Sequence, residues 1–149
     1  MRRLQRRLLL AGLILTGLLP RLGLNAAALV SATSLKCESR VNPLGLDTPE
    51  PRLSWILVSE RRGERQTAWQ ILAASTAGKL AHNQGDVWDS GKVLSADSLN
   101  LSYAGPSLRE EQAVFWKVRV WDSADRVSDY SEPARFETAL LSPSDWRAT

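Results

Sequence analysis

The chain has 149 residues, about one domain in length, and with 44% hydrophobic and 23% charged residues it is neither disordered nor fibrous in composition. Its formal net charge is +3, but five of its 19 Lys and Arg residues lie in the first 28 positions, which contain no acid. The rest of the chain therefore has 14 basic and 16 acidic residues and no basic stripe, so we predict no nucleic-acid partner.

The first 28 residues have the three parts of a secretory signal peptide. Four arginines between positions 2 and 7 precede an uncharged apolar run at 8–19, and the segment ends in Ala26, Ala27 and Ala28. A helix of twelve residues spans only ~18 Å, whereas a membrane anchor must cross ~30 Å. We predict cleavage after Ala28, with Ala32 as the second candidate. The chain would then contact a membrane only through the signal peptide during export, and the mature protein would be periplasmic or extracellular. The sequence does not decide between the general secretory and the twin-arginine export route.

The mature chain predicts an all-β, immunoglobulin-like or fibronectin type III-like antiparallel sandwich of about seven strands. Short runs with a period of two alternate with Gly, Pro, Asn and Asp, as in sheets that bury one face. The expected strands are one beginning at Leu35 and then 52–57, 66–74, 87–91, 98–103, 114–122 and 134–138. We expect 75–85, which is polar, to be a loop. The predicted sandwich covers 33–141, and 142–149 would begin a linker to a further module.

The predicted core consists of alternate residues on these strands. The strongest run, 114–122, has one apolar face. The other face is mixed and carries Phe115, Lys117, Arg119 and Trp121. The side chains expected in the core are Leu53, Trp55, Leu57, Trp69, Ile71, Ala73, Leu99, Leu101, Tyr103, Val114, Trp116, Val118, Val120 and Phe136. Cys37 is the single cysteine, so no intramolecular disulfide can form, and we predict a buried structural thiol.

The sequence indicates no catalytic, cofactor-binding or metal-binding site. Asp47, Asp89, Asp122, Asp125 and Asp129 fall at predicted turns, where aspartate bonds to neighbouring backbone amides. His82 is the only histidine and lies in the expected loop, so neither a metal cluster nor a Ser-His-Asp set can be assembled around imidazole.

Six tryptophans in so short a chain raise a second possibility, because sugars stack on exposed aromatic rings. Trp88 and Trp121 are the candidates for contact with a carbohydrate or with another domain. Trp121 lies on the face opposite Trp116 if its strand is regular, so it cannot share that core. A free-standing carbohydrate-binding or adhesion module is therefore the alternative function.

Several blocks of sequence, in order, resemble the N-terminal module of bacterial α-L-rhamnosidases. They include Pro51-Arg52-Leu53-Ser54-Trp55 together with 37–38, 42–47, 66–71, 88–93, 103–106, 116–122 and 131–133. This family usually has Tyr where Trp69 stands and Trp where Tyr130 stands, and both differences keep an aromatic ring.

The resemblance implies a non-catalytic accessory sandwich, since in this family an (α/α)6 barrel further along the chain holds the catalytic carboxylates. The implied partners are the downstream domains of the same exported enzyme and rhamnose-containing glycans. The segment 142–146 resembles the linker to the next module, so we expect the sequence to be part of a longer hydrolase; it would then be inactive alone.

Overall fold

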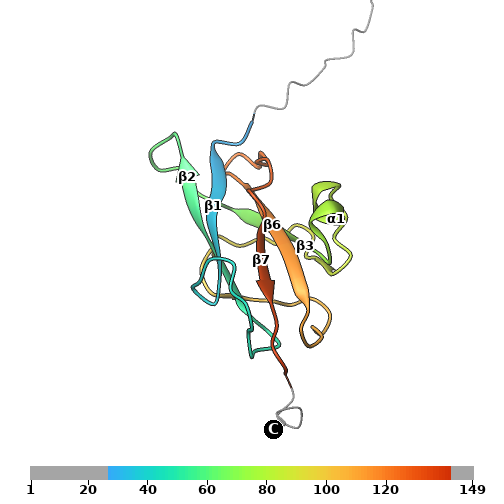
Figure 1. Cartoon of the computed structure of the whole chain (residues 1–149). Coiled ribbons are helices and arrows are strands. Elements are labelled where there is room, and N and C mark those ends of the chain that lie inside the picture. The colour runs from blue at the N-terminus through green and yellow to red at the C-terminus, as the bar shows by residue number, and fades with distance from the viewer. Residues whose placement is uncertain (1–26, 142–149) are drawn as a thin grey trace, which may run out of the picture.

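Seven strands form two antiparallel sheets that face each other in the computed structural model, which describes residues 27–141 (Figure 1). One sheet has the order β1-β2-β5, from β1 (Val30–Cys37), β2 (Arg52–Ser59) and β5 (Leu101–Ser102). The other has the order β4-β3-β6-β7, from β3 (Ala68–Ala74), β4 (Trp88–Asp89), β6 (Ala113–Trp121) and β7 (Ala134–Glu137). This arrangement confirms the predicted immunoglobulin-like sandwich.

The core lies between the sheets and contains three tryptophan rings. Trp116 of β6 and Trp55 of β2 are almost fully buried, and Trp69 of β3 packs edge-on against Trp55 with ring centroids 5.9 Å apart. The predicted core positions of β2, β3 and β6 are confirmed, with the exception that Leu57 is only partly buried. Cys37 is a buried free thiol, as predicted, and burial raises its pKa to about 12.

The first strand begins at Val30, five residues before the predicted start and three before the predicted domain boundary. The alternation is hidden by a bulge between Thr33 and Lys36, where Ser34 has a φ of 53°. One extra residue changes which positions face inward, so Val30 and Ala32 before the bulge and Leu35 and Cys37 after it all reach the core.

Two other expectations about local structure were wrong. The segment expected to be a loop contains a short helix, α1 (Ala77–Ala81), with Thr76 as its N-cap. Leu80 of this helix is buried against Leu72 and Ala74, so both faces of β3 are covered. The strand expected at 98–103 is reduced to two residues, and Leu99 is 68% exposed because Asn100 beside it takes a φ of 55° that breaks the alternation.

A buried amide joins the core to the loop before β5, and the sequence pattern did not indicate it. Gln66 is 1% exposed; its Oε1 accepts from Trp55 Nε1 at 3.0 Å, and its Nε2 donates to the carbonyls of Ser95 and Asp97. Every polar group of this side chain is therefore paired inside the protein, as buried amides require.

Candidate functional site

Trp88 lies on the edge strand β4 and is only half-buried, but its ring is not free on all sides. Tyr103 packs against it at a centroid distance of 5.0 Å and an interplanar angle of 70°. The chain at Gly105 passes so close that a Cβ there would lie 2.7 Å from Trp88 Cγ. The ring therefore packs against the core and is not open on all sides to a ligand.

Trp121 lies at the end of β6 on the face that the sequence predicted, outside the central core. Only 9% of the residue is accessible, so its ring is not an open face on which a sugar could stack. Lys92 Nζ lies 4.9 Å and Arg119 Cζ 5.3 Å from the centroid of its ring, so two cationic side chains cover it.

Cations and rings continue to alternate along this outer face of β6. Arg119 also contacts the ring of Tyr130, with Cζ 4.9 Å from the centroid, and Lys117 Nζ lies 4.5 Å from the same ring. Lys117 is 8% exposed and donates to Leu80 O at 2.8 Å and Asn83 Oδ1 at 2.6 Å, while burial lowers its pKa. These contacts attach α1 and the segment around Tyr130 to the sheet, so the cations act in packing.

Two of the predicted turn aspartates do bond to neighbouring backbone. Asp89 Oδ1 accepts from Gly91 N at 2.9 Å and also from Gln70 Nε2 at 2.6 Å. Asp122 is completely buried at the end of β6 and accepts from the amides of Ala124 and Arg126. Asp125 instead forms an ion pair with Lys92.

Asp122 also binds the backbone of the residue just before β1, which the sequence pattern did not indicate. Its Oδ2 accepts from the backbone N–H of Leu29 at 3.0 Å and from Arg126 Nε at 2.8 Å. Desolvation by burial raises the pKa of Asp122, but the hydrogen bonds from Leu29, Arg126 and Ala124 outweigh it and hold the pKa below its ordinary value.

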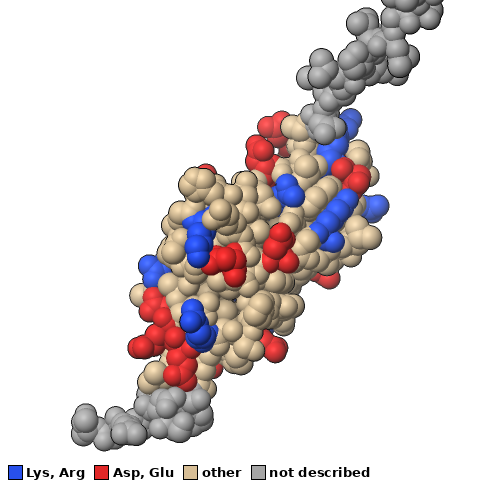
Figure 2. All heavy atoms as spheres, turned by 90° about the vertical axis from the view of Figure 1, so that its right-hand side faces the viewer, with Lys and Arg blue, Asp and Glu red and all other residues tan. Residues whose placement is uncertain are grey.

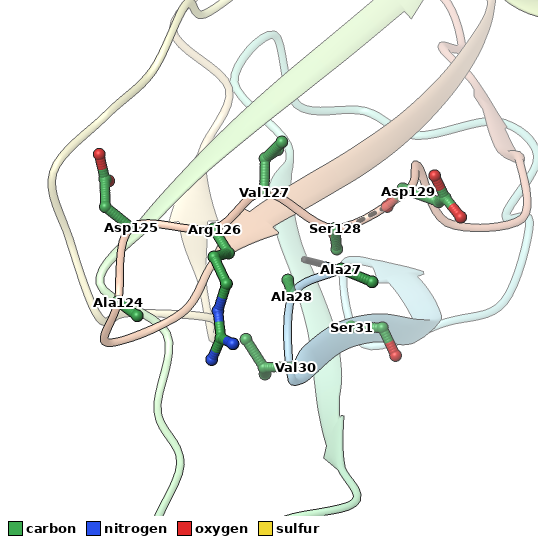
Figure 3. A pocket seen from close by; sticks show the side chains of 10 residues that line it. All are labelled: Ala27, Ala28, Val30, Ser31, Ala124, Asp125, Arg126, Val127, Ser128 and Asp129. Atoms are coloured by element: carbon green, nitrogen blue, oxygen red, sulfur yellow. Dashed lines mark hydrogen bonds between the residues drawn. The ribbon is translucent and has the colours of Figure 1, made fainter. Parts of the chain in front are cut away.

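A groove lies beside this contact, between the start of β1 and the turn after β6 (Figure 3). Its walls are Ala27, Ala28, Val30 and Ser31 on one side and residues 124–129 on the other, and its volume is about 590 Å³. Arg126 has the longest of the labelled side chains, and it extends toward the start of β1 in Figure 3. This groove is therefore a depression in the surface between two segments of the chain.

Within residues 27–141, no group of three or more His, Cys, Asp or Glu side chains could hold a metal ion. His82 is exposed and caps the end of α1, with Nδ1 2.8 Å from Gly78 O. No helix in the described segment is long and apolar enough to cross a membrane. On the face seen in Figure 2, acidic and basic side chains are interspersed.

Taken together, the described residues define an immunoglobulin-like β-sandwich domain whose buried polar groups serve its own packing. The chain belongs to a family of such domains: residues 32–142 match the model described as "Rha78A-like, N-terminal immunoglobulin domain".

The similar proteins are α-L-rhamnosidases. One from Streptomyces avermitilis is 48% identical over 116 residues, which are 78% of this chain but 11% of the relative. The crystal structure of a Streptomyces avermitilis α-L-rhamnosidase with L-rhamnose has a TM-score of 0.75 at 47% identity, covering 80% of this chain and 11% of that one. An α-L-rhamnosidase structure from Dictyoglomus thermophilum has a TM-score of 0.76 at 43% identity, and the match covers 79% of this chain and 13% of that one. The chain thus spans about a tenth of the length of the relatives it matches.

Proposed function

We propose that this chain is the N-terminal accessory sandwich of an exported bacterial α-L-rhamnosidase. The whole enzyme would hydrolyse terminal α-L-rhamnose from glycosides or polysaccharides, and domains further along the chain would carry the catalytic carboxylates. The observation that carries the proposal is the match of almost the entire described segment to the N-terminal domain of this family.

The chemistry of the acidic side chains supports an accessory role. Hydrolysis of a glycosidic bond uses two carboxyl groups on opposite sides of a sugar, separated by ~5 Å or by ~6.5–9.5 Å. Asp122 cannot meet a sugar because it is 0% exposed and accepts four hydrogen bonds from Leu29, Ala124 and Arg126. Asp89 is bonded to Gly91 and Gln70. These carboxylates stabilise turns and strand ends.

The surroundings of the two candidate tryptophans favour packing over sugar binding. A sugar stacks on an open ring face, whereas Trp121 lies beneath Lys92 and Arg119 and Trp88 packs against Tyr103. A free-standing carbohydrate-binding module is therefore the weaker proposal, and a role in contacting a neighbouring domain suits both rings better.

The position of the two ends of the described chain suits a module that is followed by others. The first described residues and the end of β7 lie at opposite ends of the sandwich (Figure 1). A downstream domain could therefore follow β7 without covering the groove at the start of β1. We propose these downstream domains as the partners, with periplasmic or extracellular location after removal of the signal peptide.

Activity assays on the purified chain and on a chimera test the accessory role. The chain alone is expected to release no rhamnose from an aryl α-L-rhamnoside. A Streptomyces avermitilis enzyme carrying residues 29–141 in place of its own N-terminal domain is expected to stay soluble and active, whereas the same enzyme without any N-terminal domain should lose thermal stability. Saturable rhamnose release by the chain alone would contradict the proposal, as would unchanged stability after the deletion.

Sugar binding is tested separately by titrating the purified chain with L-rhamnose while recording tryptophan fluorescence. No saturable change is expected. A saturable change that disappears in Trp88→Ala or Trp121→Ala would favour the carbohydrate-binding alternative.

A further inference from the structure

We propose that hydrolysis of the Ala28–Leu29 bond during export creates an α-ammonium group on Leu29 that forms an ion pair with the buried carboxylate of Asp122. This inference rests on the proposed export of the chain. It goes further by selecting the processing site and by assigning a binding partner to the new terminus.

The backbone of Leu29 is already held in place on both sides. Its N–H donates to Asp122 Oδ2 at 3.0 Å, and its carbonyl accepts from Ser59 Oγ at 2.9 Å. The next residue, Val30, begins β1 and pairs with Ser59 of β2. A terminus made at Leu29 therefore needs no rearrangement of the strand to reach the carboxylate.

The packing of β1 distinguishes between the two candidate cleavage sites. Cleavage after Ala32 would remove Val30 and Ala32, which are 2% and 7% exposed in the core, together with their pairing to β2. Cleavage after Ala28 removes none of these contacts, since Ala27 is exposed and Ala28 only half-buried at the rim of the groove in Figure 3. Loss of buried apolar surface makes the later site unfavourable for folding.

Among the described residues, two carboxylates but one bound guanidinium lie around Asp122, so a further positive charge would be favourable there. Arg126 Nε donates to Asp122 Oδ2 at 2.8 Å, while a second carboxylate, Glu64, lies close by and accepts from Ser123 N at 3.0 Å. Hydrogen bonds from Ser123 hold the pKa of Glu64 below its ordinary value, and the negative charge of Asp122 opposes this shift. An ammonium group at Leu29 N would offset the negative charge of this pair of carboxylates. Its hydrogen bond to Asp122 would join two charged groups, whereas in the present hydrogen bond only the acceptor is charged.

The reaction consumes one water molecule and requires a signal peptidase. The amide bond breaks, Ala28 leaves as the carboxylate end of the signal peptide, and the nitrogen of Leu29 becomes an amine. That amine takes up a proton, because an α-amino group has an ordinary pKa of about 7.7–8.0. Contact with a buried carboxylate favours the protonated form and raises this pKa.

The test is export of the full chain from a bacterial host, followed by the intact mass of the exported protein and amine-selective acylation of its terminus near pH 7. The expected terminus is Leu29. Its α-amine should react at least about tenfold more slowly than that of the Asp122→Asn variant, because each unit of pKa changes the reactive neutral fraction tenfold. Asp129→Asn is the matched control, since this carboxylate lies on the same turn but is exposed, and its α-amine should react as slowly as the original.

The outcomes separate this inference from the export proposal. An uncleaved chain would overturn both, whereas a terminus at residue 33 would overturn this inference alone. If Asp122→Asn loses its β-sheet circular dichroism, the rate of acylation of the unmodified protein is measured against pH. A terminal pKa above 8 supports the ion pair, and a value in the ordinary range overturns it.

Discussion

Trp116 is one of the largest fully buried side chains between the two sheets, and its replacement tests the fold directly. The residue is 0% exposed, and its β6 neighbours Val114, Val118 and Val120 face the same core. Trp116→Ala would leave a large cavity and lower the free energy of unfolding by about 3–5 kcal/mol. The indole Nε1 has no hydrogen-bond partner among the described residues, so this loss comes from packing alone.

This absence of a partner makes Trp116→Phe informative. Phenylalanine keeps much of the ring and loses no hydrogen bond, so the expected loss is about 1–2 kcal/mol. Trp121→Ala is the matched control on the opposite face of the same strand. It should cost about 2 kcal/mol, because it loses ring burial and two cation–π contacts outside the central core.

Urea unfolding followed by far-UV circular dichroism would measure all three losses without using tryptophan fluorescence. The denaturant dependence of the free energy should stay constant while the midpoint changes. Equal losses for the two alanine variants would refute the assignment of the faces. A Phe variant as unstable as the Ala variant would refute the claim that the indole N–H contributes no hydrogen bond.

Three further predictions follow from buried or crowded groups. Burial raises the pKa of Cys37 from 9.0 to about 12, so the folded state favours the neutral thiol; this contribution to stability is complete below pH 9 and is lost as the pH rises toward 12. The free energy of unfolding should therefore fall more steeply over this pH range than it does in Cys37→Ala. Parallel curves for the two proteins would contradict this prediction. Gly105→Ala should destabilise the protein by about 1–3 kcal/mol, since the new Cβ would lie 2.4 Å from Tyr103 Oη. Gly78→Ala in α1 places its Cβ in open space and should stabilise the protein by up to about 1 kcal/mol. Thermal melts compare the two variants, and equal shifts in melting temperature would contradict the crowding at Gly105. Gln66→Leu should cost about 2–3 kcal/mol because it leaves a buried indole N–H unpaired; chemical unfolding measures the loss, and a change below ~0.5 kcal/mol would mean that the amide is replaceable.

Some of the candidate site could be predicted from the sequence, and some could not. Alternation along 114–122 correctly separated Trp121 from the core that contains Trp116, because side chains on a strand point to opposite faces in turn. The burial of Trp121 could not be predicted, since Lys92 and Arg119 approach its ring from separate segments. The bond between Leu29 and Asp122 joins residues 93 positions apart, and no local pattern indicates such a contact.

The sequence by itself determined the class of fold, the core-facing positions of β3 and β6, and the family. Period-two burial is a local property, and it needs only the order of apolar and polar residues along each strand. The tertiary structure decided where β1 begins, that 77–81 forms a helix, and which polar groups are buried. These features depend on contacts between distant segments. A bulge changes which residues of β1 face the core, Leu80 of α1 packs against β3, and the hydrogen bond from Leu29 to Asp122 forms only when the start of β1 lies at the end of β6.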